Sequence, residues 1–159
     1  MLKDKVAVIH GAGGDVGGAV ARAFAREGAK LFLSGRNLPK VEAVAADIAS
    51  RGGLAEAAQV DALDEQAVEN YLGAVVEKAG AIDISFCAIS IAGALKTKAP
   101  LLDLSAEEFG LPITSYTQAN FLTARSAARR MVARRSGVIL TITATTSRMS
   151  TSPVNSPGS

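Results

Sequence analysis

Short apolar runs alternate with longer, alanine-rich amphipathic segments along almost the whole chain, and this alternation is the strongest constraint on its fold. The runs predict five strands, at residues 6–9, 31–33, 54–60, 82–89 and 138–142. Helical spacing predicts helices between them, from the glycines to Gly28 and over about 37–50, 64–79 and 114–134. A capping box, Ser105 with Glu108, predicts a short helix that Pro112 breaks or redirects. Because alternating strands and helices form βαβ units, we expect a Rossmann-like α/β fold, a doubly wound parallel sheet.

The last fifteen residues depart from this pattern. They hold eight Ser or Thr and two Pro and show no apolar periodicity. We therefore predict one domain over residues 1–144 and a flexible Ser/Thr/Pro-rich tail over 145–159. A parallel sheet truncated after its fifth strand would leave apolar surface uncovered, so we expect that strand to be prone to edge pairing.

Composition excludes several classes of protein. With 48% hydrophobic and 20% charged residues, the 159-residue chain is typical of a globular domain. A net charge of +2 does not indicate a nucleic-acid partner. The arginines of 125–135 lie at a predicted helix C-terminus, which favours cations, and no aromatic platform accompanies them. We expect no membrane span, no signal peptide and no metal site, and the single cysteine, Cys87, fits a cytoplasmic, reducing compartment.

A glycine-rich loop follows the first predicted strand and opens the first helix. Backbone N–H groups at a helix N-terminus favour a phosphate, and glycines let it come close to the backbone. In this strand–loop–helix context the glycines predict a dinucleotide-binding domain over 1–144. The residues expected to contact the cofactor here are Gly11, Gly13, Gly14, Asp15, Val16 and Gly17. His10, at the edge of the loop, is expected to be a strand-end residue whose ring bonds locally.

The second strand ends in Ser34-Gly35-Arg36-Asn37, nineteen residues beyond Gly17. An acid near this point holds the ribose 2′-hydroxyl of NAD, whereas an arginine matches the 2′-phosphate of NADP. No acid lies between Lys30 and Lys40, so Arg36 favours NADP(H) over NAD(H). Asp61, after the third strand, either accepts a hydrogen bond from the adenine amino group or simply starts the next turn.

In these features the sequence resembles the short-chain dehydrogenase/reductase family over about residues 5–145. The resemblance rests on His10-Gly11-x-x-Gly14-x-x-Gly17, Leu33-Ser34-Gly35-Arg36-Asn37, Val60-Asp61-Ala62, Gly80-Ala81-Ile82-Asp83-Ile84 and Gly137-Val138-Ile139-Leu140-Thr141-Ile142. It implies a doubly wound sheet and NAD(P)-dependent oxidation or reduction of alcohols and carbonyls. It also implies that Asp61 and the backbone of Ala62 bracket the adenine, and that relatives pair through the helix at 114–134 and the helix after the fifth strand. Because this chain has only the first of these helices, a homo-oligomer is plausible for a longer product and doubtful for this one.

Four departures separate the chain from the family pattern. Cys87-Ala88-Ile89-Ser90 stands for the family's Asn-Asn-Ala-Gly, so only the backbone of Cys87, Ala88 and Ile89 can approach the adenosine ribose. Cys87 itself is expected to be a buried, inert thiol. Tyr116 replaces the asparagine of the long helix. Ala144 replaces the catalytic serine, and a slip of one residue would let Thr143 or Thr145 supply the hydroxyl.

The fourth departure concerns acid–base chemistry. The family's Tyr-x-x-x-Lys is absent: Tyr71 and Tyr116 are the only tyrosines, and neither is followed four residues later by lysine. Without that pair nothing donates a proton to a carbonyl, so no catalytic residue is assigned. Two interpretations remain open: an incomplete or inactive form of an NADP(H)-dependent oxidoreductase, or a non-catalytic NADP(H)-binding module that acts as a sensor or partner subunit.

Overall fold

The computed structural model describes residues 1–89 and 101–143. Its strands are β1 (Val6–His10), β2 (Lys30–Gly35), β3 (Leu54–Gln59), β4 (Ile84–Cys87) and β5 (Val138–Thr141). Its helices are α1 (Asp15–Arg26), α2 (Leu38–Ser50), α3 (Glu65–Ala79), the 3-10 turn η2 (Leu101–Asp103) and α4 (Ala106–Val132). The predicted tail over 145–159 lies outside the described residues.

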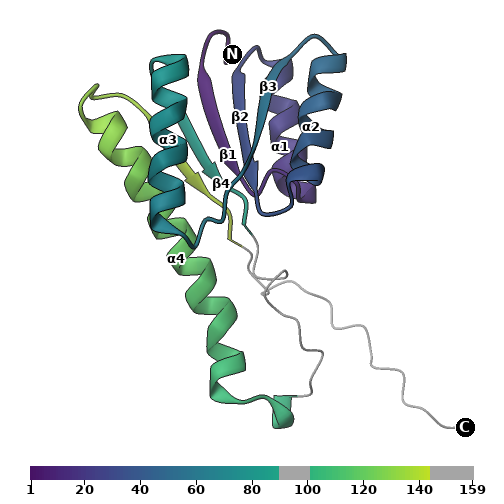
Figure 1. The fold of residues 1–159 in the computed structure, drawn as a ribbon, viewed down its shortest axis with the longest axis vertical. Helices are drawn as coiled ribbons and strands as arrows, with labels where there is room; N and C mark the ends of the chain where they lie inside the picture. The colour runs from purple at the N-terminus through teal and green to yellow at the C-terminus, as the bar shows by residue number, and fades with distance from the viewer. Residues whose placement is uncertain (90–100, 144–159) are drawn as a thin grey trace, which may run out of the picture.

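The five strands form one parallel sheet in the order β3-β2-β1-β4-β5. Helices α1 and α2 cover one face, and α3 and α4 cover the other (Figure 1). The chain runs outward from β1 in one direction to β2 and β3, and in the other to β4 and β5. The predicted doubly wound Rossmann-like fold is confirmed, and its topological switch point lies between β1 and β4.

Alternation along β1 builds a separate apolar core on each face of the sheet. Ala7 and Ile9 point into the core shared with α1 and α2, while Val6 and Val8 point into the core shared with α3 and α4. A strand buried on both faces is typical of the centre of a parallel sheet, and all five residues of β1 are buried. The central strand is thereby held rigid, and so is the loop that follows it.

Three helices begin, and two helices end, at capping residues that the sequence indicates. Asn37 and Asp64 cap α2 and α3 through side-chain oxygens, and Ser105 with Glu108 forms the capping box of α4. Gly28 follows the end of α1 with φ +88°, and Gly80 ends α3 with φ +79°, both in the left-handed region that favours glycine.

The expectation that Pro112 breaks the helix is wrong. Helix α4 runs without interruption from Ala106 to Val132, with Pro112 inside it and buried. Proline removes one hydrogen bond and crowds the carbonyl four residues before it, which costs about 3 kcal/mol in a helix interior. The capping box before Pro112 and the packing of the later turns, through Ala119 and Ala127, on the sheet and α3 offset that cost.

Three strands are shorter than predicted, and the first of them, β3, ends at Gln59 rather than at residue 60. β4 ends at Cys87 rather than at residue 89, because Ala88 and Ile89 turn against the glycine loop. β5 ends at Thr141, and all four of its residues are exposed, as expected of an apolar strand at the edge of the described sheet. At the opposite edge, Glu56 of β3 forms an ion pair with Lys78.

Candidate functional site

The glycine loop is shaped by hydrogen bonds to the end of β2. The N–H groups of Gly11 and Ala12 both donate to the carbonyl oxygen of Ser34, at 2.8 and 3.0 Å. Gly11 adopts φ +77°, and the N–H of Gly14 donates back to the carbonyl of Gly11 at 3.1 Å. The loop is therefore a fixed turn whose conformation is set by the neighbouring strand.

The glycines of the loop have different roles. A Cβ on Gly17 would overlap the carbonyl of Gly11 and lie 2.9 Å from Cα of Ala12, so this glycine allows α1 to pack closely on the loop. A Cβ on Gly11 would lie 3.1 Å from the carbonyl carbon of Ala88. At Gly14, by contrast, the nearest atom would be the Gly11 oxygen at 3.4 Å, an ordinary contact. Packing thus explains Gly11 and Gly17 but leaves open space at Gly14.

Helix α1 begins beside that space. Gly14 is its N-cap, with no side-chain hydrogen bond to the first turn, and Asp15 and Val16 are its exposed first residues. The first N–H groups of a helix have no acceptor within the helix. Such a helix start can hold a phosphate group. The carboxylate of Asp15 is the one unfavourable charge beside it.

His10 supports the loop from within the sheet. Its side chain is buried, and its Nδ1 lies 2.9 Å from Oγ of Ser34, the residue directly opposite on β2. The expected strand-end position is correct, but the bonding partner is on the adjacent strand rather than local in sequence. Burial lowers the pKa of His10 from 6.5 to about 4, so the imidazole is neutral at pH 7.

Tyr71 of α3 completes a buried polar cluster with these two residues. Its ring meets that of His10 edge to face, 6.1 Å between centroids. Burial raises the pKa of Tyr71 far above 10, which keeps its hydroxyl protonated. Among the described residues, neither Nε2 of His10 nor the Tyr71 hydroxyl has a hydrogen-bond partner. The sequence placed His10 at the end of a strand, but neither its burial nor its assembly with Ser34 and Tyr71 was predicted.

The remaining predicted cofactor residues gather at the same edge of the sheet, because parallel strands end together. Arg36 follows β2 and is exposed; its carbonyl accepts a hydrogen bond from Nε2 of Gln59 at 3.1 Å. Asp61 is exposed and its Oδ1 accepts from the N–H of Leu63 at 3.0 Å, the geometry of a turn-forming aspartate. A contact of Asp61 with an adenine stays a prediction.

Beyond β4, the backbone of Ala88 lies beside the glycine loop. Cys87 is buried, and burial is the main cause that raises the pKa of its thiol, in agreement with an inert side chain. Ala88 and Ile89 are the residues that a side chain at Gly11 would meet. Ala62 is buried behind Asp61, so only its backbone could contact an adenine. Their roles toward a cofactor stay predictions.

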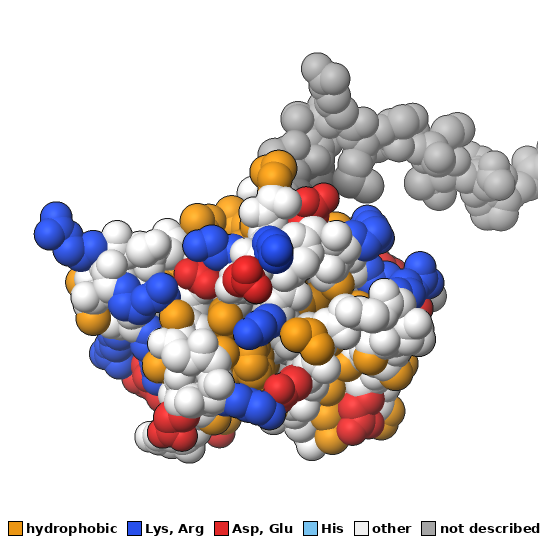
Figure 2. Space-filling model, turned by 90° about the horizontal axis from the view of Figure 1, so that it is seen from above, with side chains coloured by type: hydrophobic (Ala, Val, Ile, Leu, Met, Phe, Trp, Pro, Cys, Tyr) orange, Lys and Arg blue, Asp and Glu red, His pale blue; other side chains and the backbone are white. Residues whose placement is uncertain are grey.

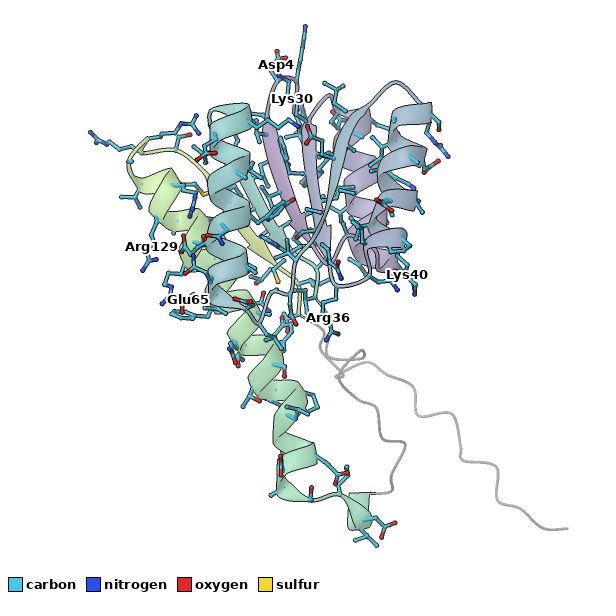
Figure 3. All side chains as sticks on the ribbon, viewed as in Figure 1. Asp4, Lys30, Arg36, Lys40, Glu65 and Arg129 are labelled. Atoms are coloured by element: carbon cyan, nitrogen blue, oxygen red, sulfur yellow. The ribbon has the colours of Figure 1, made fainter. Side chains whose placement is uncertain are left out.

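Lys40 is a residue of this edge that sequence reasoning missed. It lies in the first turn of α2, and a Cβ on Gly13 would come within 2.9 Å of its Cβ. The only signal in the sequence was Gly13, the third consecutive small residue of the loop, where a larger side chain would clash with Lys40. In Figure 3, Arg36 and Lys40 both lie at the lower edge of the sheet, whereas Lys30 lies at the upper edge.

Within residues 1–89 and 101–143, neither tyrosine hydroxyl is hydrogen-bonded to a lysine. The hydroxyl of Tyr116 donates to the carbonyl of Ile142, joining α4 to the end of β5. The amide of Asn120 donates to the Tyr116 carbonyl at 2.9 Å. Thr143 is exposed after β5, while Ala144 and Thr145 lie outside the described residues. No group of three or more potential metal ligands occurs within 1–89 and 101–143.

The arginines of α4 do not form a free basic face. Arg125 pairs with Glu65, and Arg129 and Arg130 pair with Glu69, at 3.0 and 2.9 Å. Burial would raise the pKa of Glu69, but its hydrogen bond and charge interaction with Arg130 outweigh burial and hold that pKa low. Acidic and basic side chains are also interspersed on the face seen from above (Figure 2). The described helices include none with the length and apolarity needed to cross a membrane.

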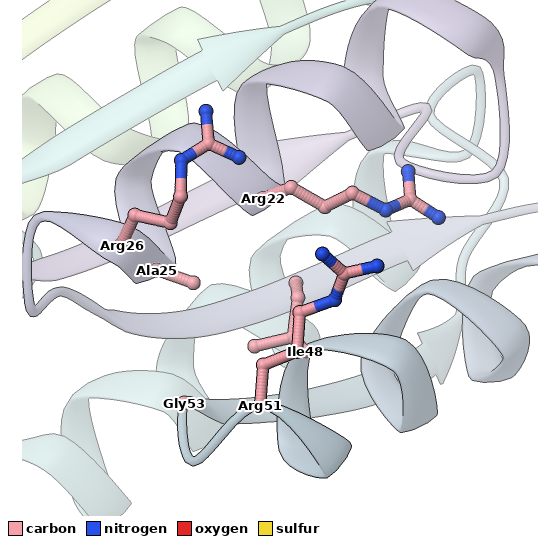
Figure 4. Close-up of a pocket in the computed structure, with 6 residues that line it drawn as sticks. All are labelled: Arg22, Ala25, Arg26, Ile48, Arg51 and Gly53. Atoms are coloured by element: carbon pink, nitrogen blue, oxygen red, sulfur yellow. The ribbon is translucent and has the colours of Figure 1, made fainter.

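A small pocket lies between the C-terminal parts of α1 and α2. It is lined by Arg22, Ala25, Arg26, Ile48, Arg51 and Gly53 (Figure 4). Asp47 neutralises part of its charge, since Arg22 and Arg51 both bond its carboxylate. Helix C-termini are also the negative ends of their dipoles, which the arginines complement. The pocket is thus accounted for by interactions within the chain, and it lies away from the glycine loop.

Comparison with known proteins agrees with this fold and site. Residues 5–156 match the family described as short chain dehydrogenase. The 2,3-dihydro-2,3-dihydroxybenzoate dehydrogenase of Bacillus subtilis is 32% identical over 141 residues, which cover 89% of this chain and 52% of that enzyme. The chain belongs to the short-chain dehydrogenase family, and it spans about half the length of the curated relatives it matches.

Solved structures of the family superpose well on the chain. NAD⁺-bound xylitol dehydrogenase is 27% identical with a TM-score of 0.80, covering 88% of this chain and 53% of the other. A metagenomic short-chain oxidoreductase in complex with NADP is 27% identical with a TM-score of 0.81, covering 94% and 66%. One of these relatives binds NAD⁺ and the other NADP, so family membership alone does not fix the cofactor.

Proposed function

We propose that this chain is the cofactor-binding part of an NADP(H)-dependent oxidoreductase that acts on an alcohol or a carbonyl compound. The observation that carries the proposal is the open space at Gly14. Gly14 is the N-cap of α1, and packing within the described residues does not account for a glycine there. A pyrophosphate would fit this position, because N–H donors and the positive end of the helix dipole meet there.

Preference for NADP(H) follows from the charges at the end of β2. Arg36 is exposed, and among the described residues it forms no ion pair. No acid lies between Lys30 and Lys40 to accept a hydrogen bond from a ribose 2′-hydroxyl. A guanidinium at this position matches the phosphate of NADP(H) instead. Asp61 and the backbone of Ala62 would border the adenine, and Cys87, Ala88 and Ile89 the adenosine ribose.

The proposal is tested by titrating NADPH and NADH into the chain by calorimetry. We expect wild type to bind NADPH more tightly, and Arg36→Ala to lose most of that preference while NADH affinity stays within about twofold. Arg51→Ala is the matched control, since Arg51 is an exposed arginine at the C-cap of α2, the end of that helix opposite to Lys40. Stronger binding of NADH by wild type would refute the assignment.

A non-catalytic NADP(H)-binding module is the second candidate function. It is favoured by the engagement of the Tyr116 hydroxyl with the Ile142 carbonyl and by the burial of Tyr71. Neither tyrosine has a lysine four residues later to lower its pKa. We expect the purified 159-residue chain to bind NADPH without oxidising it in the presence of ketones and aldehydes. Turnover of any of these carbonyl compounds would exclude the module.

Self-association through α4 and a cytoplasmic setting complete the proposal. Phe109, Ile113, Phe121 and Val132 are large apolar side chains exposed on this helix. Such exposure is typical of a surface that another chain covers. We propose that this surface forms one side of a homo-oligomer, and sedimentation of the chain with and without Phe121→Glu would measure its contribution. The single thiol, Cys87, is compatible with the cytoplasm.

A further inference from the structure

The start of α2 lies directly against the glycine loop. A Cβ on Gly13 would be 2.9 Å from Cβ of Lys40 and 3.4 Å from the backbone N of Val41, so only glycine permits this approach. The Lys40 side chain therefore begins beside the loop, and its flexible four-carbon stem lets the ammonium reach several ångströms around that point. Lys40 is exposed, so this ammonium is free to move.

The surroundings of Lys40 concentrate positive charge. The first turn of α2 contains no acidic residue, and the Asn37 side chain accepts the N–H of Lys40 at 3.2 Å. A cation in the first turn of a helix opposes the helix dipole, which costs free energy in the absence of an anion. Among the described residues, neither Lys40 nor Arg36 is in an ion pair. Both cations lie beside the end of the sheet at which its strands terminate (Figure 3).

We propose that Lys40 is a second specificity-determining residue, which holds the 2′-phosphate of NADP(H) together with Arg36. Arg36 would approach this phosphate from the end of β2, and Lys40 from the side of Gly13. The inference rests on the proposed function, because it assigns a further contact in the same cofactor site. It explains why an unfavourable cation is kept in the first turn of α2, next to a position restricted to glycine.

The test separates the charge of Lys40 from its packing. Lys40→Met keeps a long apolar stem beside Gly13 and removes only the ammonium, whereas Lys40→Arg keeps a positive charge. Lys30→Met is the matched control, because Lys30 is an exposed lysine at the opposite edge of the sheet. Calorimetric titrations of NADPH, NADH, adenosine 2′,5′-bisphosphate and ADP are compared for each variant, so no readout depends on catalysis.

We expect Lys40→Met to weaken NADPH and adenosine 2′,5′-bisphosphate binding by roughly 5- to 50-fold, and NADH and ADP binding by less than twofold. Lys40→Arg should retain most of the preference, and Lys30→Met should behave as wild type. A fall of less than threefold in the NADPH-to-NADH affinity ratio of Lys40→Met would overturn the inference. If Arg36→Ala still removes the preference in that case, the proposed function stands. If wild type itself does not prefer NADPH, both fail.

Discussion

Between pH 7 and pH 5, acid should destabilise this protein mainly through one residue, His10. Its pKa is about 4 in the folded chain and 6.5 when solvated, because burial in the sheet disfavours the imidazolium. The unfolded state thus binds the proton more tightly, and stability falls as the pH drops through the interval between these values. Linkage gives a loss of about 2 kcal/mol between pH 7 and pH 5, approaching about 3 kcal/mol below pH 4.

The interval from pH 7 to pH 5 isolates this effect. His10 is the only histidine of the chain. The carboxylates whose pKa is lowered on folding, such as Asp47 and Glu69, have ordinary pKa values of 3.8 and 4.5, so they lose their stabilisation at lower pH. Urea unfolding followed by far-UV circular dichroism would give the free energy of unfolding at each pH. His10→Asn retains a group able to hydrogen-bond Ser34 but does not titrate. The reasoning is refuted if His10→Asn loses as much stability as wild type over this interval.

Three further substitutions probe the loop and α4. Gly14→Val should fold normally, since position 14 is open, but should abolish binding of both NADPH and NADH in the same titrations. Gly110→Ala should raise the free energy of unfolding by about 0.5–1 kcal/mol, because Gly110 is inside α4 and a Cβ there meets nothing within 4 Å. Glu69→Gln should lower that free energy by roughly 1 kcal/mol, through weaker bonds to Arg129 and Arg130. A Gly14→Val chain that binds either cofactor normally, an unchanged Tm for Gly110→Ala, or a Glu69→Gln chain as stable as wild type would contradict the respective prediction.

The sequence predicted those parts of the fold that depend on near neighbours. Asn37, Asp64 and Ser105 begin helices through hydrogen bonds to residues three positions away, so their patterns are visible in the chain. Pro112 misled the prediction because its local cost is offset by packing contacts that only the folded chain makes.

The candidate site divides in the same way. Gly11 and Gly17 could be assigned to the site because a strand, a turn and a helix follow one another in the sequence. The hydrogen bond between His10 and Ser34, by contrast, depends on the register of β1 with β2. The approach of Lys40 to Gly13 depends on where α2 enters its layer, and no spacing of residues in the sequence specifies that. Contacts between elements therefore supplied what the motifs could not.

The two hydrogen bonds that the N–H groups of Gly11 and Ala12 donate to the Ser34 carbonyl also determine how the free energy of cofactor binding would be distributed. A loop already held at Gly11 and Ala12 has little conformational entropy left to lose when a dinucleotide arrives. The heat capacity change on binding would then reflect only the surface that the ligand itself covers, without the larger negative value that accompanies coupled folding. In calorimetric terms this chain should behave as a preorganised receptor.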